Sequence, residues 1–214
     1  MRYKTTTVAP EWNDAYRLGY IGFEFTDDSF ISNGVVYFER YETVPGASVP
    51  DLPISHTFVV TGPDECVEAL AHGVTISNLH ERFTSPHTHV CFRKPRFYTD
   101  VEAHGIAAAA YGEVGKGYGY GLIFADLLAN TVVGHWLNIH TGNVPNRIVT
   151  ALCDRKLSDI CSEAAAISLQ SQAVLRVGIL KGPARMVTPK ALFEDDFVFE
   201  CWRNGAKLRS QVFD

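Results

Sequence analysis

The chain has no excess of positive charge and no long hydrophobic run. Its 214 residues carry 19 Lys and Arg against 24 Asp and Glu, a net charge of −5, which disfavours nucleic acid as the main partner. The longest apolar stretch, residues 119–135, is interrupted by Asp126, Asn130 and Gly134. It therefore falls short of the ~18 apolar residues that a transmembrane helix needs, and we expect no membrane span.

The sequence also lacks targeting and cross-linking signals. The first residues, MRYKTTTVAPEWND, contain no apolar run of the kind found in signal peptides. The five cysteines are an odd number, and no two of them form a C-x-x-C pair. Such scattered thiols indicate a reducing compartment and no disulfide framework. We therefore expect a cytoplasmic protein, or one that a phage carries or that is delivered as an effector.

What remains is the composition of an ordinary globular domain, with 46% hydrophobic and 20% charged residues. Periodicity and turn residues predict an α+β domain with an antiparallel sheet. Segment 65–70 is ambiguous, because its propensity favours a helix while its place after Gly62-Pro63-Asp64 favours the return strand of a hairpin. Strands are predicted at 20–25, 35–38, 54–61, 88–93, 174–180 and 197–202, and helices at 100–111, from 122 to 128 and at 160–172.

Cys161 is the cysteine whose position best suits chemistry. It begins the Ala-rich helix predicted at 160–172, with Ser158 or Asp159 expected to cap the helix. Backbone N–H groups and the helix dipole at such a terminus favour the thiolate, which is the nucleophilic form of cysteine. The alternative is a small, inert buried side chain, which is the usual role of a free cysteine.

His56 and Glu68 form a possible pair across the predicted hairpin. With the turn centred on Gly62, the two residues face each other, with Cβ atoms about 5 Å apart. A carboxylate there would fix the imidazole tautomer and stabilise the imidazolium. The alternatives are a satisfied sheet histidine and a solvent-facing glutamate, and a one-residue slip would move Glu68 to the other face.

The order of these residues resembles the circularly permuted papain-like peptidases, the YiiX-like relatives of NlpC-type cell-wall amidases. In that family a histidine strand comes first and a Cys-Ser-Glu helix comes late. The resemblance covers roughly residues 20 to 202. The matching motifs, in chain order, are SHTFVV (55–60), VEA (67–69), GV (73–74) with Leu79, GKGY (115–118), ICSEAA (160–165) and TPKAL (188–192).

The resemblance implies a single permuted papain-like domain over residues 1–214 and a thiol hydrolase without a cofactor. Cys161 would be the nucleophile, His56 the base and Glu68 the orienting acid, while Tyr118 would lie near the oxyanion. The implied substrate is a peptide or a peptidoglycan fragment, cleaved at an amide bond through a thioester. Gly119 stands where the family often has an acidic residue, so the local substrate contacts differ.

Three other interpretations remain open. A lipid acyltransferase or esterase of the lecithin:retinol acyltransferase-like type would use similar chemistry. A binding module would keep the triad only as a vestige. A metal site would use the group at His80, His87, His89 and Cys91, although zinc usually takes four ligands and we expect no metal.

Two further expectations concern residues outside this constellation. Cys66, Cys91, Cys153 and Cys201 are expected to be packing residues. The basic cluster at 93–96 is expected to be a solvated loop, with contact to an anionic substrate as the alternative.

Overall fold

A six-stranded antiparallel sheet forms the centre of the computed structural model, which describes residue 12 and residues 15–26, 47–70, 73–84, 87–118, 158–159, 161–202 and 207–209. The order of the strands is β4-β3-β2-β1-β5-β8. All of the paired strands in this sheet are antiparallel. The strands are β1 (Ile21–Thr26), β2 (His56–Gly62), β3 (Glu65–Leu70), β4 (Gly73–Asn78), β5 (Thr88–Arg93) and β8 (Lys207–Arg209).

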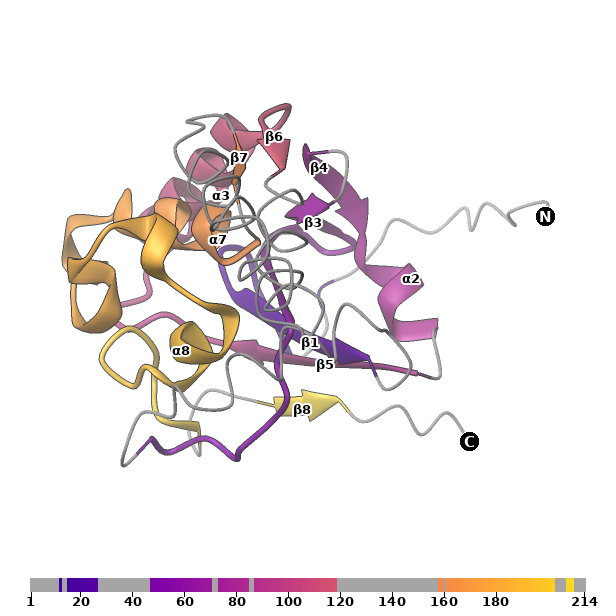
Figure 1. The fold of residues 1–214 in the computed structure, drawn as a ribbon, viewed down its shortest axis with the longest axis horizontal. Coiled ribbons are helices and arrows are strands. Elements are labelled where there is room, and N and C mark those ends of the chain that lie inside the picture. The colour runs from indigo at the N-terminus through magenta and orange to yellow at the C-terminus, as the bar shows by residue number, and fades with distance from the viewer. Residues whose placement is uncertain are drawn as a thin grey trace, which may run out of the picture.

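Helices cover both faces of the sheet, and Figure 1 shows α3 and α7 on one side with α2 on the other. The coarse α+β class is therefore confirmed. The short strands β6 (Gly117–Tyr118) and β7 (Ser158–Asp159) form a separate parallel pair. The helices are α2 (Leu79–Thr84), α3 (Asp100–Glu113), α7 (Cys161–Gln170) and α8 (Pro189–Glu194), with short 3-10 helices η1 (Ala173–Leu175), η2 (Gly178–Lys181) and η3 (Ala184–Met186).

The alternation of side chains along β2 divides the interior into two apolar clusters. Val59 belongs to the larger cluster, which lies between the sheet and helices α3 and α7. Phe58 and Val60 belong to the smaller cluster, which includes Leu79 and Phe83 of α2. The two helical layers thus meet opposite faces of the same strand.

Small side chains let α7 pack closely in the larger cluster. Ala164, Ala165 and Ala166 are all buried there, and Ser168 satisfies its hydroxyl on the carbonyl of Ala164, 2.8 Å away. At the helix start, the hydroxyl of Ser162 donates to the carbonyl of Val187 at 2.6 Å. The first turn of α7 is therefore fixed to the segment that precedes α8.

The predicted hairpin is present, but its register differs from the expectation. Pro63 and Asp64 form the turn, and a bulge lies between Val60 and Gly62. Glu68 consequently pairs with Phe58 and not with His56. The shift is two residues, so Glu68 stays on the face predicted for it.

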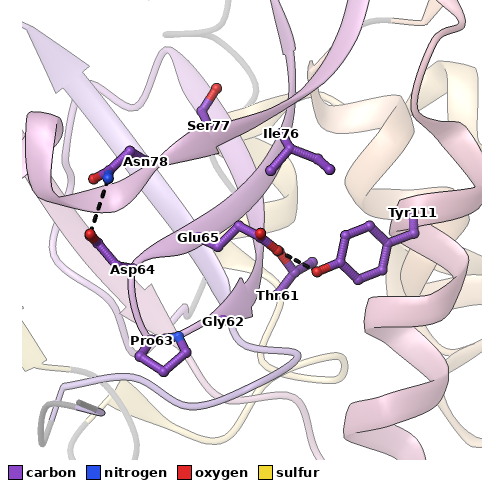
Figure 2. A pocket seen from close by; sticks show the side chains of 9 residues that line it. All are labelled: Thr61, Gly62, Pro63, Asp64, Glu65, Ile76, Ser77, Asn78 and Tyr111. Carbon is purple, nitrogen blue, oxygen red and sulfur yellow. Dashed lines mark hydrogen bonds between the residues drawn. The ribbon is translucent and has the colours of Figure 1, made fainter. Parts of the chain in front are cut away.

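Side chains beyond the turn hold this end of the hairpin (Figure 2). The Thr61 hydroxyl donates to the Glu65 carboxylate at 2.8 Å, and the hydroxyl of Tyr111 from α3 donates to the same oxygen. The Asn78 amide donates to Asp64 at 3.0 Å. These residues line an open pocket at the end of β2 opposite to His56.

The strands predicted at 174–180 and 197–202 are wrong. The first segment forms η1 and η2, and the second contributes only an isolated bridge between Phe199 and Pro95. Asp195 explains both results. One of its carboxylate oxygens accepts from the N–H of Ile179 at 2.6 Å, and the other accepts from the N–H of Phe197 at 2.7 Å, so these donors are not available to a strand ladder.

Two expectations about the basic cluster and the cysteines also fail. Arg93 is fully buried and donates to Asp196 and to the carbonyl of Glu200, each at 2.7 Å, so it is not part of a solvated loop. Cys201 is exposed and is not a packing residue, whereas Cys66 and Cys91 are buried as expected. The predictions at 35–38 and 122–128, and that for Cys153, lie outside the described residues.

Among the described helices, none is long and apolar enough to cross a membrane.

Candidate functional site

Cys161 is the first residue of α7, as the sequence predicted. Ser158 and Asp159 lie in β7, and their side chains are outside the described part of the structure, so the expected cap stays a prediction. Cys161 itself is 4% exposed and packs against the sheet in the larger cluster. Its thiolate accepts backbone N–H groups from Thr57 of β2 and Ser162 of its own helix.

Three buried thiols of this chain differ in their electrostatics. Burial raises the pKa of Cys66 well above its ordinary value and that of Cys91 to about 12. Burial acts in the same direction on Cys161, but the charge and hydrogen bond of His56, with the two backbone donors, outweigh it and lower the pKa of the Cys161 thiol. Only Cys161 among these three is held in an environment that favours the thiolate.

His56 is the first residue of β2, at the end of the strand, where its ring meets both partners. Its Nε2 lies 2.7 Å from Oε2 of Glu68, and the ring also hydrogen bonds to Cys161. Burial disfavours the imidazolium, but Cys161 and Glu68 overcome that cost and raise the pKa of His56 to about 10. The two shifts together favour a thiolate–imidazolium pair.

Glu68 reaches His56 diagonally across the hairpin. Its direct partner in the ladder is Phe58, and His56 lies two residues further along the same strand face. Diagonal neighbours of this kind lie within reach of long side chains. The Glu68 side chain is 1% exposed, so its carboxylate depends on protein donors rather than on water.

Arg82 and Glu24 complete this network, although neither was predicted from the sequence. Arg82 extends from α2 and donates to Glu24 of β1 and to Glu68, whose Oε2 also meets His56. A short polar helix such as LHERFT is typical of a solvated surface, and its sequence gives no sign of these partners. One feature could have pointed to Glu24, because this residue stands opposite His56 in the antiparallel ladder between β1 and β2.

The segment predicted to supply Tyr118 lies beside the start of α7. In the β6–β7 pair, Tyr118 is opposite Asp159, two residues before Cys161. The backbone of Lys116 accepts from the N–H of Val74, which ties this segment to β4. The side chain of Tyr118 lies outside the described part of the structure, so its role near an oxyanion stays a prediction.

The weak metal candidates are not brought together. His87 is exposed, the ring of His89 stacks on Phe25 with centroids 4.6 Å apart, and Cys91 is buried beside the carbonyl of Phe23. Within the described residues, no three His, Cys, Asp or Glu side chains gather into a metal-binding group.

Searches against protein-family models, curated proteins and solved structures find no match for this chain. Function is therefore inferred from the geometry around Cys161.

Proposed function

We propose that this protein is a thiol hydrolase in which Cys161, His56 and Glu68 act as a catalytic triad. The observation that carries the proposal is the arrangement of three groups: the buried thiol at the first residue of α7, the His56 ring beside it, and the Glu68 carboxylate, whose Oε2 lies 2.7 Å from Nε2 of His56. This arrangement lowers the pKa of the thiol and raises that of His56 to about 10. A thiol that serves only for packing requires neither a lowered pKa nor a histidine with a raised pKa beside it. Burial alone would raise the pKa of the thiol and lower that of the histidine.

The chemistry follows from the position of each group. The Cys161 thiolate attacks a carbonyl carbon, and the negative charge on the carbonyl oxygen is stabilised by the backbone N–H of Cys161, with Tyr118 as a further candidate donor. His56 gives its proton to the leaving group as the carbon–nitrogen or carbon–oxygen bond breaks. Water, deprotonated by His56, then cleaves the thioester and releases the acid, which restores the thiolate–imidazolium pair.

Glu68 acts through His56 in this scheme. It accepts a hydrogen bond from Nε2, which leaves Nδ1 as the ring nitrogen available to the thiol. Both nitrogens of an imidazolium are donors, so the charged ring serves the carboxylate and the thiolate at once. The permuted papain-like domain and the amide substrate, a peptide or peptidoglycan fragment, rest on the resemblance in motif order.

Alkylation with iodoacetamide at neutral pH, followed by peptide mapping, tests the proposal. Modification should concentrate on Cys161, while Cys66 and Cys91 should stay unmodified in the folded protein. Cys201 is exposed and serves as an internal comparator. A Cys161 that reacts no faster than Cys201 at pH 6 to 7 would contradict the assignment.

Turnover is then measured on amide and ester panels, with peptidoglycan fragments among the amides. Cys161→Ala should abolish hydrolysis and leave the circular dichroism spectrum unchanged, with Cys201→Ala as the matched control. Cleavage of acyl esters without amides would instead identify a lipid-type esterase.

A further inference from the structure

One carboxylate oxygen at the site serves two cations. Oε2 of Glu68 accepts from the guanidinium of Arg82 and lies 2.7 Å from Nε2 of His56. The other arm of Arg82 binds Glu24. The Arg82 and Glu24 side chains are only 13% and 15% exposed, so this chain of charges is largely withdrawn from water.

The sheet provides a complementary binding site for the guanidinium of Arg82. Its central carbon lies 4.6 Å from the centroid of the Phe58 ring. That ring in turn lies over Gly22, where a Cβ atom would overlap three ring carbons. Carboxylates flank this guanidinium site on the two strands that neighbour β2, with Glu24 on β1 and Glu68 on β3. A planar fork that stacks and binds two carboxylates is specific to arginine.

We propose that Arg82 is a positioning residue, which keeps the carboxylate of Glu68 directed at His56 and is itself held by Glu24. The proposal rests on the proposed function, because its consequence is felt at Cys161. Without its guanidinium partner, the carboxylate of Glu68 is no longer held against Nε2 of His56. The charge of Glu68 then no longer balances the imidazolium, and the thiolate loses its own partner.

The direction in which the pKa of His56 changes distinguishes a positioning role of Arg82 from a direct effect of its charge. Removing the positive charge of Arg82 would, by itself, make the imidazolium more favourable and raise the pKa of His56. If Arg82 instead holds the Glu68 carboxylate against Nε2 of His56, its removal lowers that pKa, because the imidazolium loses its direct hydrogen-bond partner. The two explanations therefore predict shifts in opposite directions.

The experiment is an NMR titration of ¹⁵N-histidine-labelled protein, with His56 assigned from a His56→Gln sample. Arg82→Gln should lower the pKa of His56 by about one unit or more, and Arg82→Lys, which keeps the charge but not the fork, should lower it by less. Arg96→Gln is the matched control, because Arg96 donates to the carbonyl of Phe199 instead, and it should leave the titration unchanged.

Two outcomes overturn different claims. An unchanged or raised pKa of His56 in the Arg82 variants overturns the positioning role alone. If Arg82→Gln fails to fold, Arg82→Lys carries the same test. A His56 that titrates near pH 6.5 in the unaltered protein, together with an unreactive Cys161, overturns the proposed function and this inference with it.

Discussion

Nε2 of His56 lies 2.7 Å from Oε2 of Glu68, although the two residues are not partners in the strand ladder. Glu68 is almost fully buried, so its carboxylate has direct influence on the imidazolium charge. Through this contact, Glu68 of β3 influences the charge of His56 and, through His56, the protonation of Cys161 at the start of α7.

Glu68→Gln should therefore weaken the site without removing its nucleophile. The amide carries no charge to balance the imidazolium, so the proton of the pair returns to sulfur in a larger share of molecules. We expect kcat/KM to fall roughly 10²-fold, measured on whichever substrate the panel identifies. The control is Glu65→Gln on the same strand, whose carboxylate binds Thr61 and Tyr111. Equal losses in both variants would show that the effect is structural.

The pH dependence of activity should show a broad active range. The Cys161 pKa is lowered, so its proton leaves below the roughly 8.5 of an ordinary thiol. The His56 pKa is raised to about 10, so the imidazolium persists until that pH. The thiolate–imidazolium pair exists between these limits, with Glu68, Glu24 and Arg82 as the other charged groups facing it.

Alkylation rates of Cys161 should therefore rise at a pH below 8.5 and stay high, while kcat/KM should fall again near pH 10, where His56 loses its acidic proton. Both are measured across the same buffers. A Cys161 alkylation midpoint at or above 8.5 would mean that no ion pair forms.

The parts of this site that local patterns encode were predictable. Strand β2 and its turn follow from a β-branched segment and Gly-Pro-Asp, and the helix at Cys161 follows from its alanine-rich sequence. Strand β3 was ambiguous, because its own propensity favours a helix. The position of the turn at Pro63 and Asp64 and the bulge near Gly62 were not predictable, yet together they shift the register by two residues, which keeps Glu68 on the same face as His56. A period of two along a strand makes that facing relationship tolerant of even shifts.

The parts that depend on distant partners were not predictable. Arg82 lies 58 residues from Glu24 and 14 from Glu68, and nothing in the sequence of α2 indicates that its arginine is largely withdrawn from water. Asp195 likewise removes the backbone donor of Ile179, 16 residues away, from any ladder. In both cases a tertiary contact overrides what local propensity favours.

Gly22→Ala should disturb the site by displacing the Phe58 ring, which packs against Gly22. The added Cβ atom would overlap the Phe58 ring. The ring must therefore move, and Arg82 loses the aromatic surface on which its guanidinium stacks. We expect a loss of about 1–3 kcal/mol in the free energy of unfolding, measured by urea denaturation, together with slower alkylation of Cys161. The matched control is Gly112→Ala in α3, where a Cβ atom meets nothing within 4 Å. That variant should be neutral or stabilising by up to about 1 kcal/mol.

Arg93→Met should be among the most destabilising single substitutions in the described part of the chain. Arg93 is fully buried, lies 5.0 Å from the Phe199 ring centroid, and joins β5 to Asp196 and to the carbonyls of Phe193 and Glu200. Removing it leaves buried carbonyls without their donor, so we expect a loss of about 3–5 kcal/mol in urea unfolding.

Its neighbour on the chain supplies the comparison for Arg93. Lys94 is partly exposed and pairs with Glu200 at 2.6 Å, so Lys94→Met should cost less than about 1 kcal/mol. Similar losses in the two variants would mean that Arg93 contributes no more than a surface ion pair. A large difference would establish that Arg93 is a structural link between β5 and the segment after α8, which explains why this arginine is unavailable to an anionic substrate.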